Sequence, residues 1–180
     1  MLEKTQKVLQ KFAKYVVQQS RSNLTKQKHN VTKELYNSIG YRITDNKEDV
    51  FLKFTVDGYG AFLDKGVKGA KPSLVKKGKQ KAPNSPYKYR FKKPPLKSIL
   101  EWVKDRGIRL RTSDGQFSRG TYKTIAFLLQ KRIFAQGIAP SFFFTKPFNA
   151  AFKKYPDLIA EAYAEDIGGE LEQQFKNFTK

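Results

Sequence analysis

The chain has 180 residues and a net charge of +20, which comes from 36 Lys and Arg against 16 Asp and Glu. It contains no Cys and a single His, which excludes disulfides, thiolate metal sites and Cys nucleophiles and leaves His29 as the one candidate imidazole base. With 39% hydrophobic and 14% aromatic residues, the composition favours a packed core, and the charge predicts a polyanion or an acidic protein surface as partner.

The N-terminal residues carry charges every few positions and lack the apolar stretch of a signal peptide. No window approaches the roughly 18 apolar residues that suggest a transmembrane helix. We therefore expect a protein that is made in the cytoplasm and has no membrane association.

Two helices are predicted at the start of the chain. Residues 1–22 form an amphipathic pattern, because apolar residues that include Phe12 and Val16 recur on one face opposite a row of Lys. Residues 32–39 are predicted to form a second, short helix with Thr32 as its N-cap.

The pattern then changes to that of a β-hairpin. Residues 41–44 and 50–56 are rich in β-branched and aromatic types and flank a turn-rich segment. Alternate residues from Val50 to Val56 share one face, and an isolated hairpin is only marginally stable in water. We therefore expect the N-terminal helix to cover the hairpin, with residues 87–91 as a candidate third strand.

Residues 65–95 are expected to form a long basic loop or arm. From Lys65 to Leu100 there is no Asp or Glu, while Lys and Arg occupy twelve positions, and the Pro and Gly residues exclude a single helix or central strand. In compact domains, such a long loop without structure of its own is usually functional or disordered. The predicted contact residues of this arm, toward a protein partner or DNA, are Lys65, Lys68, Lys71, Lys76, Lys77, Lys79, Lys81, Lys88, Arg90, Lys92 and Lys93.

Aromatic residues alternate with basic residues in the arm, at Tyr87, Tyr89 and Phe91. This alternation has two interpretations. Either the rings stack on unpaired bases while Lys side chains meet phosphates, or the rings form the buried side of a strand.

Further helices are predicted after the arm, over residues 96–106 and 121–136, with a second basic loop at 108–120 between them. In the helix over 121–136, the apolar residues expected to face inward include Leu128. Another helix begins near Phe148, and Pro156 either breaks it or opens the next one.

The last segment, residues 157–178, is acidic and carries an apolar stripe that is interrupted by Gly168 and Gly169. It is either an ordinary helix packed on its own domain or an acidic element that binds the basic arm of a neighbouring copy, which would suit a head-to-tail ring. We expect one α+β domain over residues 1–155 and an acidic helical extension over 156–180. The predicted fold is a small antiparallel sheet flanked by amphipathic helices, with the long basic arm.

Three consecutive aromatic residues rarely all face one core, so the run at 142–144 is expected to contact another element or subunit. The predicted subunit-interface residues are Phe142, Phe143, Phe144, Tyr59 and Phe62.

No catalytic, cofactor-binding or metal-binding residue is predicted, and an enzyme is not expected. His29 lies in a polar, Lys-flanked segment and is best explained as a solvated surface residue. Asp45, Glu48 and Asp49 are explained by their turn, although such a cluster can hold a cation. The glycine pairs at 58–60 and 66–69 lack the strand and helix context of nucleotide-binding loops.

Two short motifs resemble those of the neck, head–tail joining and tail-completion proteins of tailed bacteriophages. The segment YGAFLDKG at residues 59–66 is similar to a YA-x-apolar-x-acidic-x-G segment of that family, and it follows two helices and a hairpin as it does there. The segment PSFFFTKPFNAA at residues 140–151 is similar to a Pro-aromatic segment that leads into a helix near the C-terminus of that family. The Lys-rich insertion and the acidic C-terminal helix depart from the family pattern.

This resemblance implies a structural virion protein without catalysis or cofactor. It implies a subunit that assembles as a sixfold or twelvefold ring in the head–tail connector, between portal or adaptor proteins and the tail. The basic arm would then contact either an acidic neighbouring protein or duplex DNA in the channel. The alternative from another class is a freestanding nucleic-acid-binding protein that uses the Lys-rich arm.

Overall fold

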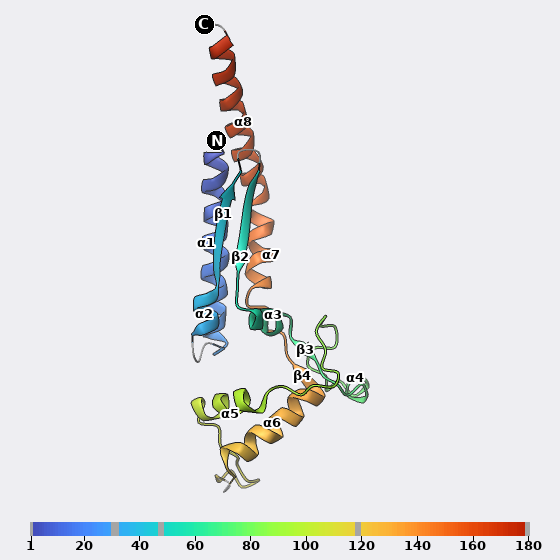
Figure 1. Ribbon diagram of the computed structural model, residues 1–180. Helices are drawn as coiled ribbons and strands as arrows, with labels where there is room; N and C mark the ends of the chain where they lie inside the picture. Colours follow the sequence, from blue (N-terminus) through green and yellow to red (C-terminus); the bar gives the residue numbers. More distant parts are fainter. Residues whose placement is uncertain (1, 30–32, 47–48, 118–119, 179–180) are drawn as a thin grey trace. The chain divides into compact units, whose positions relative to one another are not determined.

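The computed structural model describes residues 2–29, 33–46, 49–117 and 120–178 (Figure 1). The predicted α+β class is confirmed, because the helices are accompanied by two small antiparallel sheets. The chain divides into two compact units: unit 1 comprises residues 1–57 and 142–180, and unit 2 comprises residues 58–141. The expected boundary at residue 155 stays a prediction.

The described part of unit 1 is built from four helices and one hairpin. Its elements are α1 (Glu3–Lys26), α2 (Glu34–Ser38), β1 (Gly40–Asp45), β2 (Val50–Thr55), α7 (Thr145–Lys154) and α8 (Pro156–Phe178). The strands pair antiparallel, from Gly40 opposite Thr55 to Asp45 opposite Val50, which confirms the predicted hairpin.

The core of unit 1 lies between the hairpin and the long helices. Phe12 and Val16 of α1 are buried with Ala151 of α7, and aromatic side chains close around them. The ring of Phe12 lies 6.1 Å from that of Phe54 on β2 and 5.5 Å from that of Tyr155. The prediction that the N-terminal helix covers the hairpin is therefore confirmed.

The N-terminus of α1 is capped by a side chain from α8. The residue before α1, Leu2, supplies no side-chain cap. Instead, Asp166 accepts the backbone N–H of Lys4 at 3.1 Å, and it accepts both the backbone N–H and the hydroxyl of Thr5 at 2.8 Å. These hydrogen bonds satisfy donors that every helix leaves open in its first turn. They join the two ends of the chain, and α8 packs on its own unit.

Several details of unit 1 differ from the sequence-based expectations. The candidate third strand was wrong: the described part of this sheet has two strands, and Lys88 instead forms a bridge with Lys68 in unit 2. Gly168 and Gly169 do not interrupt α8, because a helix tolerates glycine where neighbouring residues maintain the backbone hydrogen bonds. Pro156 opens α8. Thr32, the predicted N-cap of α2, lies outside the described residues.

Unit 2 contains α3 (Gly58–Lys65), β3 (Val67–Lys68), α4 (Ser73–Lys76), α5 (Leu96–Asp105), α6 (Tyr122–Gln136) and β4 (Gly137–Ile138). Helices α5 and α6 pack through buried apolar residues, which are Ile99, Val103, Ile125 and Ala126. The hydroxyl of Thr121 caps α6 by accepting the backbone N–H of Thr124 at 3.3 Å. Leu128 was expected to face inward, but it is 49% exposed and lies off the buried stripe of α6.

Candidate polyanion interface

The charge of the chain is divided unequally between the two units. Unit 2 has 20 Lys and Arg against 4 Asp and Glu, a net charge of +16, whereas unit 1 has 16 against 12, a net charge of +4. The basic arm accounts for only part of this excess, because α5, α6 and the loop between them add further cations. Unit 2 is therefore the part of the chain that is best suited to a polyanion.

The predicted arm is held to its own unit by backbone pairing. The N–H of Lys68 donates to the carbonyl of Tyr87 at 2.8 Å, and the N–H of Tyr89 donates to the carbonyl of Lys68 at 2.9 Å. Strand β3 also pairs with β4, with Val67 opposite Ile138. The basic segment therefore folds back onto the end of α6, where Ala70 and Lys81 donate their N–H groups to the carbonyls of Phe134 and Gln136.

A buried amide side chain organises the turn that carries most of the Lys residues. Gln80 is nearly buried; its Oε1 accepts the N–H of Gly69 at 2.9 Å, and its Nε2 donates to the carbonyls of Gly69 and Lys71 at 3.0 Å each. This side chain thus adds to the backbone pairing of this segment, in which the N–H groups of Ala70 and Lys71 donate to the carbonyls of Phe134 and Ala135. No period or motif marks Gln80, which lies within a Lys-rich run.

Two glycines permit the close crossing of β3 and β4. A Cβ atom at Gly69 would lie 2.2 Å from the carbonyl oxygen of Ala135, and one at Gly137 would lie 2.1 Å from the carbonyl oxygen of Val67. Gly137 also has a φ of +85°, which disfavours other residues. Gly66, which joins α3 to β3, has a φ of +70°, which likewise favours glycine.

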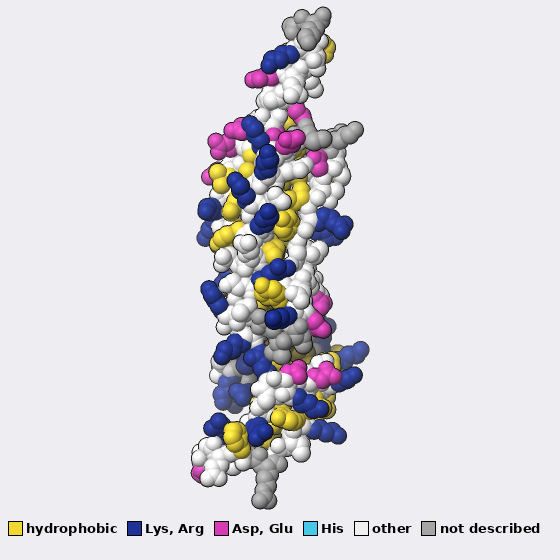
Figure 2. Space-filling view, turned by 90° about the vertical axis from the view of Figure 1, so that its left-hand side faces the viewer, with side chains coloured by type: hydrophobic (Ala, Val, Ile, Leu, Met, Phe, Trp, Pro, Cys, Tyr) yellow, Lys and Arg dark blue, Asp and Glu magenta, His cyan; other side chains and the backbone are white. Residues whose placement is uncertain are grey.

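The predicted contact cations all lie on this folded segment. Lys68 is half-buried, and the others are exposed: Lys65, Lys71, Lys76, Lys77, Lys79, Lys81, Lys88, Arg90, Lys92 and Lys93. None of them forms an ion pair within the part of the chain that the structure describes. One face of the molecule shows Lys and Arg side chains scattered over both units (Figure 2).

The aromatic residues of the arm have different environments. The ring of Tyr87 lies 4.6 Å from that of Phe62, and Tyr89 packs 6.0 Å from Phe134, so these two rings are on the inner side of the segment. Burial raises the pKa of the Tyr89 phenol above its ordinary value. Phe91, by contrast, is 92% exposed. Base stacking by Tyr87 and Tyr89 is therefore disfavoured, whereas Phe91 keeps both faces accessible.

The predicted interface aromatics also separate into two groups. Tyr59, Phe62 and Phe142 are exposed, as an interface requires. Phe143 is only 1% exposed and packs inside the chain. Phe144 is half-buried, with its ring 5.4 Å from that of Phe54. Phe143 and Phe144 thus contribute to the folded chain itself, because the run adopts a turn into α7 that directs successive side chains differently.

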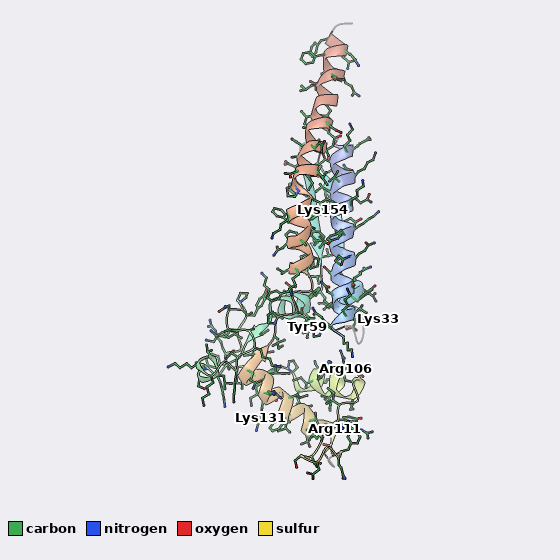
Figure 3. The ribbon with its side chains drawn as sticks, turned by 180° about the vertical axis from the view of Figure 1, so that it is seen from behind. Lys33, Tyr59, Arg106, Arg111, Lys131 and Lys154 are labelled. Atoms are coloured by element: carbon green, nitrogen blue, oxygen red, sulfur yellow. The ribbon has the colours of Figure 1, made fainter. Side chains whose placement is uncertain are left out.

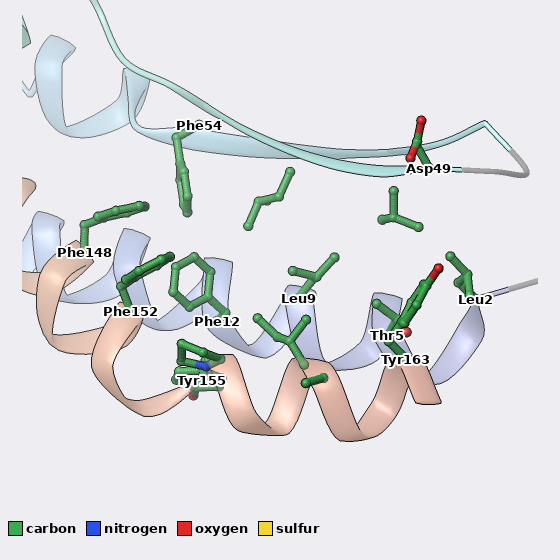
Figure 4. A pocket seen from close by; sticks show the side chains of 15 residues that line it. Leu2, Thr5, Leu9, Phe12, Asp49, Phe54, Phe148, Phe152, Tyr155 and Tyr163 are labelled. Carbon is green, nitrogen blue, oxygen red and sulfur yellow. The ribbon is translucent and has the colours of Figure 1, made fainter. Parts of the chain in front are cut away.

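Unit 1 has an apolar groove of about 720 Å³ between the hairpin and the helices. Figure 4 shows Phe12, Phe54, Phe148, Phe152 and Tyr155 facing this space. The polar groups of its lining belong to the side chains of Thr5, Asp49, Tyr155 and Tyr163. The hydroxyl of Thr5 already donates to Asp166. The groove therefore offers apolar contact.

The described residues contain no group of three or more His, Asp and Glu side chains that could hold a metal ion. Glu48 lies outside them. None of the described helices is long and apolar enough to cross a membrane. The expectations that the protein is no enzyme and uses no cofactor stay predictions.

Comparison of the chain with known protein families, with curated proteins and with solved structures finds no match.

Proposed function

We propose that this protein is a structural subunit of the head–tail connector of a tailed bacteriophage, where copies form a ring between portal or adaptor proteins and the tail. The order of the two resembling motifs along the chain supports this proposal. The observation that carries it is the difference in surface between the two units. Unit 1 has a net charge of +4 and exposed apolar residues, and it is joined to unit 2, which has a net charge of +16.

Unit 1 supplies the surface for assembly. Its exposed large apolar residues include Phe51, Phe152 and Phe178, the last of which is 88% exposed. Large exposed apolar surface typically marks interaction sites, and copies of the chain in a ring would bury it. The lower net charge of unit 1, +4, also lets copies of it approach each other with less repulsion than copies of unit 2 would meet.

Unit 2 supplies the contact to an anionic partner. The folded arm presents ten exposed cations, and they are tethered at Lys68 and Gln80 so that their backbone is already ordered. An ordered cationic surface loses less entropy on binding than a free loop does. Because a channel lined with Lys would retard passing DNA, we assign the arm to an acidic surface of the adjoining ring.

Size-exclusion chromatography with light scattering, combined with a duplex DNA binding assay, tests the proposal. We expect particles of several chains, alone or with the portal protein, and weak duplex binding. A monomer that binds duplex DNA tightly would instead establish the second candidate, a freestanding nucleic-acid-binding protein, which the charge of unit 2 favours.

A variant with four substitutions in the arm tests whether the arm binds an acidic protein surface or DNA. Changing Lys76, Lys77, Lys79 and Lys81 to Gln should abolish association with the adjoining ring and leave the salt dependence of DNA binding unchanged. If these side chains instead neutralise phosphates, the slope of log K against log salt should fall by about 0.9 for each, or about 3.6 in total. A change of that size would refute the assignment of the arm to protein.

A further inference from the structure

The loop between α5 and α6 holds a cluster of two Arg side chains and one exposed Phe. The guanidinium carbons of Arg109 and Arg111 lie 5.6 Å and 4.8 Å from the centre of the Phe117 ring. Phe117 is 60% exposed, and both Arg side chains are exposed. Figure 3 shows Arg106 and Arg111 near the same end of the α5–α6 pair, with Lys131 farther along α6.

A tight turn fixes this cluster. Arg111 and Phe117 form an antiparallel bridge, and inside it the N–H of Thr112 donates to the carbonyl of Gln116 at 2.9 Å. Gly115, with a φ of +79°, donates its N–H to the carbonyl of Thr112 at 3.0 Å. The side chain of Arg111 also donates from Nη1 to the carbonyl of Gly115 at 3.3 Å. The geometry of the cluster therefore follows from the backbone.

The cluster keeps two like charges close together. With both guanidinium carbons within 5.6 Å of one ring centre, they lie within about 10 Å of each other. Neither Arg has an ion-paired carboxylate among the residues that the structure describes. Asp114, the carboxylate in the turn, accepts a hydrogen bond from the hydroxyl of Ser113 at 3.4 Å. An anion bound by either guanidinium group would offset this local positive charge.

We infer that Arg109 and Arg111, held by Phe117, form a phosphate-binding clamp for the backbone of duplex DNA. The planar guanidinium offers paired N–H donors that match phosphate oxygens, and an aromatic ring orients it without using those donors. Phe117 is a positioning residue, because a ring already covered by guanidinium groups is poorly placed to stack on a base. The clamp is separate from the arm, and it would bind whether or not the chain forms a ring.

The alternative is that the cation–π contacts only stabilise the turn. Cation–π contacts are modestly stabilising at exposed sites, so they are sufficient for that role. The two possibilities predict different effects of an Arg→Lys replacement on the Kd for duplex DNA. Lys keeps the charge and a contact to the ring, but it loses the paired donors.

The test compares two double variants that leave the net charge unchanged. Arg109→Lys/Arg111→Lys removes the clamp, and Arg42→Lys/Arg132→Lys makes the same exchange at exposed positions on β1 and α6, outside the arm and the clamp. Fluorescence anisotropy with a short labelled duplex measures the Kd over a range of salt. We expect about a tenfold weaker Kd for the clamp variant, because Lys keeps the charge but loses the paired donors, and an unchanged Kd for the matched variant. Equal effects, or none, would overturn the inference.

Phe117→Leu tests the positioning role by a double-mutant cycle. We expect it to weaken duplex binding severalfold in the natural chain and to have no effect in the Arg109→Lys/Arg111→Lys background. A purely structural role would weaken binding equally in both backgrounds, and that result would refute the positioning role. Inorganic pyrophosphate serves as the second probe. If its Kd rises in the clamp variant while that of the duplex does not, the site takes a free phosphate compound and the assignment to DNA is wrong.

Discussion

Replacement of Asp166 by Ala should destabilise unit 1 more than any other change of an acidic residue on α8. The carboxylate accepts three hydrogen bonds from the first turn of α1, and the buried Thr5 would keep two donors without a partner. Loss of an N-cap costs about 0.5–2 kcal/mol, and each buried donor left unsatisfied costs about 1–3 kcal/mol. Because these contributions overlap, we expect a loss of about 3 kcal/mol, or a decrease in Tm of about 6–12 °C.

Thermal unfolding followed by circular dichroism measures this loss, and Glu165→Ala is the matched control. Glu165 precedes Asp166 and forms an exposed ion pair with Lys4 at 2.9 Å, which is expected to contribute little. Hydrogen exchange at the Thr5 amide should accelerate in the Asp166 variant and remain slow in the control. If both variants unfold at the same temperature, the effect is one of charge and the capping argument is refuted.

The same cap predicts how stability depends on pH. Burial acts to raise the pKa of Asp166, but the hydrogen bonds from Thr5 and Lys4 and the Lys4 charge outweigh it, so the pKa is lowered in the folded chain. The cap therefore stabilises fully above the unfolded-state value of about pH 4, and its contribution is lost as the pH falls through the lowered pKa. The Asp166→Ala variant should lack this part of the acid transition. An identical acid transition in the variant would contradict the assignment.

The remaining predictions concern the arm and α8. Gln80→Ala should destabilise unit 2 by about 1–3 kcal/mol, because three backbone groups lose their hydrogen-bond partner. Limited proteolysis should then cut the arm of the variant, and an arm that stays intact would contradict the role of this amide. Gly69→Ala should disrupt the β3–β4 crossing, since its methyl would lie 2.2 Å from a carbonyl oxygen, and a normal melting curve would refute that. Gly168→Ala meets open space in a helix and should stabilise unit 1 by about 0.5–1 kcal/mol in chemical denaturation; destabilisation would show that α8 bends there.

Elements defined by local periodicity could be predicted from the sequence. The helix over residues 1–22, the hairpin and the helix over 121–136 all follow from apolar spacing and from turn residues, as α1, β1–β2 and α6 show. Gly107 and Gly137 directly follow the helices predicted over residues 96–106 and 121–136, and both have the positive φ that is common just after a helix.

The conformation of the arm could not be predicted, because it depends on partners distant in sequence. Its anchors are the crossing of Gly69 with the end of α6 and the buried amide of Gln80, and neither produces a repeating pattern. The same reason applies to Asp166, which bonds residues 161 and 162 positions away. In the α5–α6 loop, the sequence indicated the charge, but only the cross-strand pairing of Arg111 with Phe117 brings the cluster together.

The central claim is that many copies of this chain form a closed ring. Negative-stain images of the purified chain, alone and mixed with its cognate portal protein, test it most directly. We predict rings with sixfold or twelvefold symmetry, either free or seated on the portal. Dispersed single chains under both conditions, at concentrations where the portal itself is assembled, would contradict the proposal.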